Sequence, residues 1–197
     1  MRDSWYADNR DVIKWGTLLH LAQRHRVRAI LQVAFFRSCP AHELLSDGQD
    51  VGMPKEVWDH FRDVRQVKRL GARCGVTIEV LDLPFAPRLR GCYMDTVLRA
   101  ISNRRGAKIV LLDPDTGLER RSGASKHVKI GDVQRVWRVL RPGDWLVLYQ
   151  HRSRVPDWLS SAKRKFTTAC SPAHVCTFSS PQLARDVVLL ATAKGRQ

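Results

Sequence analysis

The segment LLDPDTGLE, at residues 111–119, brings acidic side chains together with a spacing that suits a metal or substrate site. Asp113 and Asp115 are separated by one proline, and Glu119 follows four residues later. Two carboxylates this close can share a divalent cation such as Mg²⁺ or Mn²⁺, with Glu119 as a third oxygen ligand. Alternatively, Asp113 accepts a hydrogen bond from an amino group of a substrate. The same residues also suit an ordinary turn, because Pro-Asp-Thr-Gly is common turn chemistry.

A second polar cluster, YQHRSR at residues 149–154, follows another apolar stretch. His151 is the residue of this cluster that can act as a general base, since an imidazole titrates close to neutral pH. It can equally contact a phosphate beside Arg152 and Arg154. His127 allows the same two interpretations. We favour His151 because the end of a strand holds a side chain more rigidly than a loop does.

The periodicity of apolar residues predicts the elements that position these side chains. Continuous apolar stretches are typical of strands that are covered on both faces, and they occupy residues 28–36, 76–82, 107–113 and 144–150. Helical spacing of apolar residues predicts helices at residues 11–25, 55–70, 93–104, 130–140 and about 156–169. Two closing strands, 174–179 and 186–192, are joined by a short Ser-Pro link that favours an antiparallel pair.

Alternation of buried strands with helices predicts the fold class. We expect an α/β protein with a mostly parallel, Rossmann-like three-layer sheet and a closing antiparallel strand pair. The length of 197 residues suits a single domain, 1–197. Proline and glycine residues near position 50 predict a loop and helix insertion around residues 38–72.

The carboxyl ends of parallel strands meet at one edge of such a sheet, and ligands bind beyond that edge. The predicted strand ends deliver Arg37, then Asp82, then Asp113 and Asp115, and finally His151 to this edge. Acids and a histidine on one rim indicate a functional site. We therefore predict catalytic roles for Asp113, Asp115 and His151.

The charge of the chain is strongly unbalanced. Lysine and arginine number 34 against 19 aspartates and glutamates, so the net charge is +15. Such an excess favours a polyanionic partner, with nucleic acid ahead of an anionic membrane surface. Basic stretches flank the predicted rim, as a groove that follows a phosphate backbone requires. The residues that we expect to contact the substrate or nucleic acid are Arg120, Arg121, Lys126, His127, Gln150, Arg152 and Arg154.

The sequence also carries expectations about location. The first residues lack the apolar run of a signal peptide, and no stretch approaches the ~20 apolar residues of a membrane span. The five cysteines include no C-x-x-C pair, a pattern that we interpret as reduced thiols. We therefore expect a cytoplasmic protein without a membrane span.

The second half of the chain, residues 93–192, resembles the later part of class I, Rossmann-like methyltransferases. LLDPDTG stands where that family has an Asp-Pro-Pro-Tyr-like motif at a strand end, and RVLRPGDWLVLYQH is similar to its next helix, turn and strand. The resemblance implies S-adenosylmethionine as cofactor and places Asp113 and Pro114 against the substrate. It also implies cofactor contacts from Arg37 and Asp82, with Asp82 in the position of the family's ribose-binding acid. The family's glycine loop has no counterpart, because ILQVAFFRSCP contains no glycine.

Three hypotheses follow, and the first is favoured by the layout of the second half. The protein is a nucleic-acid-directed, S-adenosylmethionine-dependent methyltransferase-like enzyme. Alternatively, it is a metal-dependent nuclease or phosphodiesterase that holds Mg²⁺ or Mn²⁺ on Asp113, Asp115 and Glu119. The third hypothesis is a non-catalytic, basic nucleic-acid-binding protein on the fold of a former enzyme. The combination of DPDTGLE with YQHR is also similar to uncharacterised bacterial proteins, from which no activity carries over.

Overall fold

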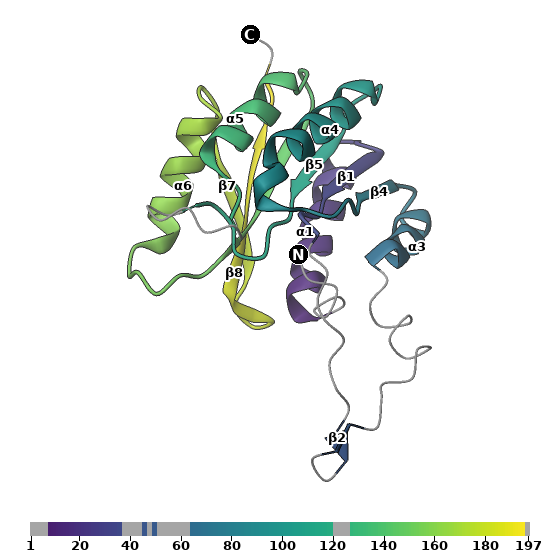
Figure 1. Cartoon of the computed structure of the whole chain (residues 1–197). Coiled ribbons are helices and arrows are strands. Elements are labelled where there is room, and N and C mark those ends of the chain that lie inside the picture. Colours follow the sequence, from purple (N-terminus) through teal and green to yellow (C-terminus); the bar gives the residue numbers. More distant parts are fainter. Residues whose placement is uncertain (1–7, 37–44, 47–48, 51–63, 120–126, 196–197) are drawn as a thin grey trace.

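The structure is a computed structural model that describes residues 8–36, 45–46, 49–50, 64–119 and 127–195. Its centre is a six-stranded sheet (Figure 1). The strands of this sheet are β1 (Ala29–Val33), β4 (Thr77–Leu81), β5 (Ile109–Leu112), β6 (Trp145–His151), β7 (Cys176–Ser180) and β8 (Ala184–Ala193). A separate short pair joins β2 (Leu45–Ser46) to β3 (Gln49–Asp50). The helices are α1 (Asn9–Arg24), α3 (Val67–Arg73), α4 (Arg90–Asn103), α5 (Ile130–Val139) and α6 (Trp158–Ala169), with 3₁₀ turns at Val64–Gln66 and Pro87–Leu89.

The strand order is β4-β1-β5-β6-β8-β7. Strands β4, β1, β5 and β6 are parallel, whereas β8 is antiparallel to both of its neighbours, β6 and β7. This arrangement confirms the predicted mostly parallel α/β sheet with a closing antiparallel pair. The order reverses at β1, because the chain places β4 on one side of β1 and β5 on the other. In open α/β sheets, ligands bind at such a reversal, beyond the carboxyl ends of the strands.

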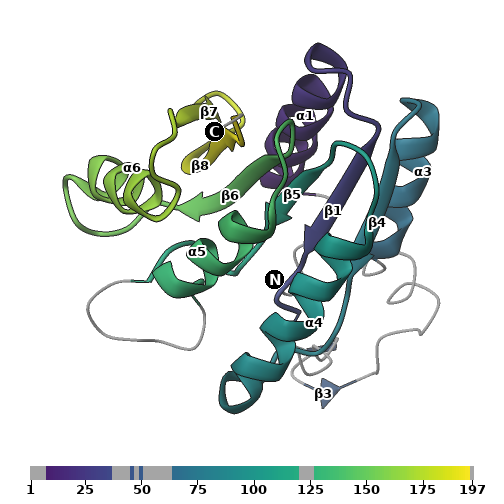
Figure 2. The same ribbon diagram turned by 90° about the horizontal axis from the view of Figure 1, so that it is seen from above.

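Helices cover both faces of the sheet, which gives the three predicted layers. Figure 2 shows α1 and α3 on one face and α4, α5 and α6 on the other. Strand residues alternate between two apolar clusters: Leu31, Val110 and Leu146 pack toward the second group of helices, and Ile30 and Ile109 toward the first. Because strands β1 and β5 bury both faces, their sequences read as continuous apolar runs.

Among the element boundaries that differ from the sequence prediction, two have a clear structural reason. The predicted helix 55–70 lies mostly outside the described residues, and the described helix α3 continues through Gly71, where a stop was expected. A Cβ at Gly71 would lie 2.5 Å from the carbonyl oxygen of Val76, so this glycine allows α3 to approach β4 closely. Strand β1 ends at Val33, before the predicted residue 36, because Phe35 takes a left-handed conformation with φ of 45°.

The proposed insertion around 38–72 lies largely outside the described residues, and it stays a prediction. None of the described helices is long and apolar enough to cross a membrane.

Candidate functional site

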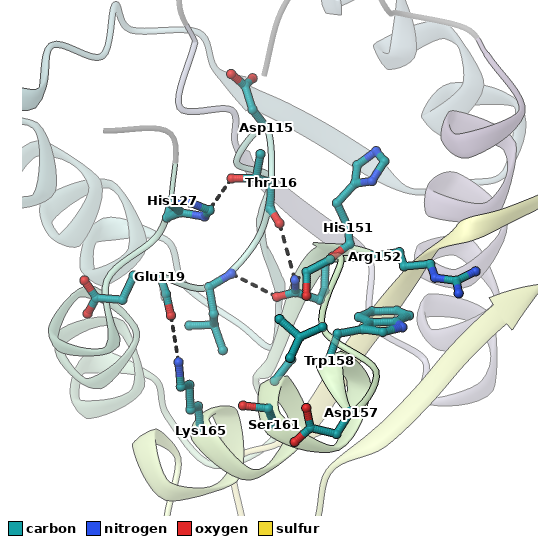
Figure 3. A pocket seen from close by; sticks show the side chains of 15 residues that line it. Asp115, Thr116, Glu119, His127, His151, Arg152, Asp157, Trp158, Ser161 and Lys165 are labelled. Atoms are coloured by element: carbon teal, nitrogen blue, oxygen red, sulfur yellow. Dashed lines mark hydrogen bonds between the residues drawn. The ribbon is translucent and has the colours of Figure 1, made fainter. Parts of the chain in front are cut away.

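A polar pocket lies at the carboxyl ends of β5 and β6, where α6 begins. Its volume is about 320 Å³. The walls come from the loop after β5, from the end of β6 with the loop that follows, and from the first turns of α6 (Figure 3). The lining residues are Asp115, Thr116, Leu118, Glu119, His127, Gln150, His151, Arg152, Ser153, Val155, Asp157, Trp158, Ser161, Ala162 and Lys165. The edge of the sheet that the sequence indicated therefore does carry a cavity.

Gln150 holds the acidic loop in place. Its amide oxygen accepts a hydrogen bond from the N–H of Leu118 at 2.9 Å, and its nitrogen donates to the carbonyl oxygens of Thr116 and His151. Gly117 allows Gln150 to make these hydrogen bonds. Its φ of +100° favours glycine, and a Cβ at this position would lie 2.3 Å from the Gln150 amide oxygen. Gln150, which we expected at the substrate, is 6% exposed and acts as an internal brace.

Asp113 lies beneath the pocket and is absent from its lining. The carboxylate is 1% exposed, and it accepts a hydrogen bond from Gln32 Nε2 at 2.6 Å. Lys14 of helix α1 forms an ion pair with the same oxygen at 2.9 Å, and it also binds Asp11 at 2.6 Å. Burial opposes the charge on Lys14, but the carboxylates of Asp113 and Asp11 outweigh it and raise the pKa of Lys14 above its usual range. Asp113 thus ties α1 to the sheet.

The other two acids of the loop have separate roles. Glu119 accepts a hydrogen bond from the N–H of Ile130 at 3.0 Å, so its carboxylate caps the start of α5. Asp115 lines the pocket. The described part of the chain contains no group of three His, Cys, Asp or Glu side chains that could hold a metal ion. The metal site predicted on Asp113, Asp115 and Glu119 is therefore not assembled in this structure.

His127 is held firmly against the wall of the pocket. Its Nδ1 lies 2.7 Å from the hydroxyl oxygen of Thr116, a contact drawn in Figure 3. Arg90 donates to the carbonyl oxygen of His127 at 2.9 Å and also binds Asp132 at the start of α5. The N–H of Val128 donates to the carbonyl oxygen of Gly117 at 3.0 Å. The sequence argument ranked His127 below His151 for rigidity, and these bonds remove that reason.

His151 lies at the rim, beside the start of the chain's first helix. Its Nδ1 is 3.7 Å from Asp186, which Arg10 binds at 2.7 Å. Burial lowers the pKa of His151 below its usual value, although the charge of Asp186 opposes this shift. The hydrogen bonds from Arg10 lower the pKa of Asp186. Burial thus favours the neutral form of the His151 imidazole over its protonated form.

The predicted cofactor residues lie apart from this pocket. Asp82 follows β4, with its side chain 41% exposed and 3.7 Å from Arg65. Arg37 lies outside the described residues. The segment after β1 offers no glycine loop, and the N–H of Phe35 is already bound to the hydroxyl of Tyr93 at 3.0 Å. Asp82 therefore follows the strand after which the ribose-binding acid was predicted, and its role stays a prediction, whereas the segment after β1 contains no glycine loop.

The basic residues expected at this rim are described only in part. Arg152 lines the pocket and is exposed, and Arg154 is exposed close by. Arg120, Arg121 and Lys126 lie outside the described residues.

Sequence reasoning missed three residues of the site. Trp158 of α6 both packs on the core and lines the pocket beside Arg152 (Figure 3). Lys165 faces the pocket and donates to the carbonyl oxygen of Glu119 at 3.0 Å. Lys14 carried no local signal beyond being a polar residue in an amphipathic helix.

No protein-family model and no curated protein matches this chain. Several solved structures do. One is a Thermobifida fusca protein assigned as a methyltransferase, with 12% identity, a TM-score of 0.45, and coverage of 95% of this chain and 80% of that one.

A second is the Burkholderia thailandensis 1,6-didemethyltoxoflavin-N1-methyltransferase, which holds 1,6-didemethyltoxoflavin and S-adenosylhomocysteine. It has 12% identity and a TM-score of 0.41, and the match covers 97% of this chain and 84% of that one. A third is the Geobacter metallireducens precorrin-6y C5,15-methyltransferase, at 12% identity, a TM-score of 0.39, and coverage of 92% and 87%. All three of these structures are named as methyltransferases. The fold class assigned above rests on this chain's own strand order and pairing.

Proposed function

We propose that this protein is a methyltransferase-like enzyme that uses S-adenosylmethionine and acts on nucleic acid. The observation that carries the proposal is the polar pocket at the carboxyl ends of β5 and β6, on the same edge as the reversal of strand order at β1. Asp82 supports it, because an exposed carboxylate after the strand next to β1 is where open α/β sheets bind a ribose. The net charge of +15 supports a polyanionic substrate.

The pocket offers side chains for binding a planar, polar substrate. Trp158 and Leu118 provide apolar surface, and Asp115, Ser161 and Lys165 provide polar groups around it. An aromatic face beside directed donors and acceptors is a common way to fix the orientation of a ring. Asp113, bonded to Lys14 and Gln32, anchors the start of the loop that carries Asp115.

The chain's own contribution to the chemistry is proton transfer. When bound, S-adenosylmethionine supplies a methyl group on a positively charged sulfur. A substrate N–H or O–H that accepts this methyl group must lose its proton. His151 is neutral and lies at the rim, and His127 lies in the wall with Thr116 orienting its ring. Either imidazole suits the role of general base.

Binding of the cofactor tests the proposal directly. We expect isothermal titration calorimetry to detect binding of S-adenosylhomocysteine to the wild-type protein. Asp82→Asn should weaken it by about 10- to 100-fold, since a hydrogen bond to a charged group contributes about 1.5–3 kcal/mol. Asp95→Asn is the matched control, because Asp95 is an exposed carboxylate on α4 that, like Asp82, is paired with an arginine. Absence of binding to the wild-type protein would overturn the proposal.

A further inference from the structure

The loops at the amino-terminal ends of the strands carry a set of exposed arginines, on the edge opposite to the pocket. Arg26 and Arg28 lie between α1 and β1, and Arg105 lies between α4 and β5. Arg141 lies between α5 and β6. With two more from the last turns of α1 and α3, we define the basic edge as Arg24, Arg26, Arg28, Arg73, Arg105 and Arg141.

The topology makes these arginines neighbours although they are far apart in sequence. They precede β4, β1, β5 and β6, which are consecutive in the sheet. Neighbouring strands are about 4.8 Å apart, so the four strands span about 14 Å. A nucleic-acid duplex carries one negative charge per about 1.7 Å of its axis when both strands are counted, so about eight phosphates lie along such a span and some of them face the protein. In Figure 1, this edge is the end of the sheet where the C-terminus emerges.

The basic edge has almost no counter-charge. In the loops 25–28, 74–76, 104–108 and 140–144, the one acidic residue is Asp144. Asp144 is 1% exposed, and its carboxylate is already bound to Lys108 Nζ at 3.0 Å and to the N–H of Arg141 at 2.8 Å. No described residue forms a hydrogen bond or ion pair with the side chains of Arg26, Arg28 or Arg105. Their charges therefore point to solvent unneutralised.

Helix ends explain only part of this pattern. Cations in the last turn of a helix are favoured by the helix dipole, which accounts for Arg24 and Arg73. Arg26, Arg28 and Arg105 lie beyond the helix ends, where the dipole falls off quickly. A separate reason is required for placing three unpaired guanidinium groups on two adjacent loops.

We propose that the basic edge binds the phosphate backbone of nucleic acid, away from the pocket. All six members are arginines, whose planar fork matches phosphate oxygens with two parallel hydrogen bonds. A membrane surface fits less well, because membrane docking also needs apolar side chains. Among the described residues, the exposed large apolar side chains include Val12, Leu83 and Val155, and none lies in these loops. Binding of this kind is independent of base sequence and of methyl transfer.

The salt dependence of binding tests this proposal, because each phosphate contact contributes about 0.9 to the slope of log K against log salt concentration on duplex DNA. The probe is a fluorescein-labelled DNA duplex, followed by fluorescence anisotropy. We expect the triple variant R26Q/R28Q/R105Q to bind more weakly, with a slope smaller by about 2 to 3 than that of the wild-type protein.

The matched control removes the same charge elsewhere. R88Q/K163Q/R164Q changes three exposed cations outside the basic edge, and we expect its slope to change by less than about 1. Equal losses in the two triple variants would show a mere effect of net charge and overturn the proposal. Absence of duplex binding by the wild-type protein would also overturn it.

Two further measurements serve as controls for this experiment. R26K/R28K/R105K keeps the charge and should keep most of the slope, so it separates loss of binding from loss of folding. Vesicles of phosphatidylserine in phosphatidylcholine supply the competing anionic surface. If R26Q/R28Q/R105Q lost vesicle binding but kept duplex binding, the basic edge would be a membrane contact instead. Binding of S-adenosylhomocysteine, measured in parallel, reports on the proposed function separately and should be unchanged in the basic-edge variants.

Discussion

The two edges of the central sheet carry charge in different ways. At the carboxyl edge, acids stand beside bases: Asp186 binds Arg10, and Asp157 and Asp115 share the pocket with Arg152. At the amino edge, the exposed charges are arginines, and the acid Asp144 is buried. A balanced, hollowed edge suits selective binding of a small polar group, whereas an edge of one sign suits a polyanion. The net charge of the chain therefore does not by itself locate the pocket.

Each edge also contains a buried lysine–aspartate pair, and the two pairs differ in what they support. Lys108 and Asp144 join the starts of β5 and β6, and both side chains are 1% exposed. Lys14 and Asp113 join α1 to the end of β5, directly below the loop that lines the pocket. Loss of the Lys108–Asp144 pair should therefore change stability alone. Loss of the Lys14–Asp113 pair should change both stability and the pocket.

The largest effect is expected from breaking the pair at the amino edge. Asp144→Ala leaves the Lys108 ammonium buried without its carboxylate and removes acceptors from the N–H groups of Lys108 and Arg141. Removal of one partner of a buried pair costs about 3–5 kcal/mol, and we expect a loss of that size in the free energy of unfolding. Urea denaturation measures it. A loss below about 1 kcal/mol would contradict the assignment of this pair as a structural link.

A smaller loss is expected at the carboxyl edge, together with a local change. Lys14→Met leaves Asp113 buried, but Gln32 still donates to its carboxylate. We expect a loss of about 3 kcal/mol in the free energy of unfolding, toward the lower end of the range for a broken buried pair. Hydrogen exchange should also become faster in the loop 113–118, of which Asp115, Thr116 and Leu118 line the pocket, and it should not do so in Asp144→Ala. Equal exchange in the two variants would remove the distinction between the edges.

The smallest effect concerns the pH dependence of stability. The pKa of His151 is lower in the folded protein than in the unfolded chain, so the unfolded state binds the proton more readily. Above about pH 6.5 His151 does not lower the free energy of unfolding. As the pH falls below that value, protonation of the unfolded state lowers it. Thermal unfolding between pH 7 and 5 should show a smaller decrease in Tm for His151→Gln than for the wild type. His174→Gln, an exposed histidine at the amino edge, serves as control.

Local pattern was sufficient for most of the fold. Apolar runs and helical spacing predicted the strands β1, β4, β5 and β6, the helices α1, α4, α5 and α6 and the antiparallel closing pair, because burial on one or two faces leaves a direct trace in the sequence. Local pattern was insufficient where tertiary packing overrides local propensity. The predicted helix 55–70 stopped short of Gly71, but α3 continues through this glycine, whose missing Cβ allows close contact with Val76 and Ile78 at the start of β4.

The sequence by itself determined the elements, the polar residues that follow each strand and the sign of the charge. Only the tertiary structure decided the roles of those residues. The acids of LLDPDTGLE looked equivalent in sequence, yet Asp113 binds Lys14, Glu119 caps α5 and Asp115 lines the pocket. The basic edge likewise arises from single arginines in loops that the sheet order brings together. Partners that are distant in sequence leave no local pattern, because what a carboxylate or guanidinium binds depends on what the fold places within a few ångströms of it.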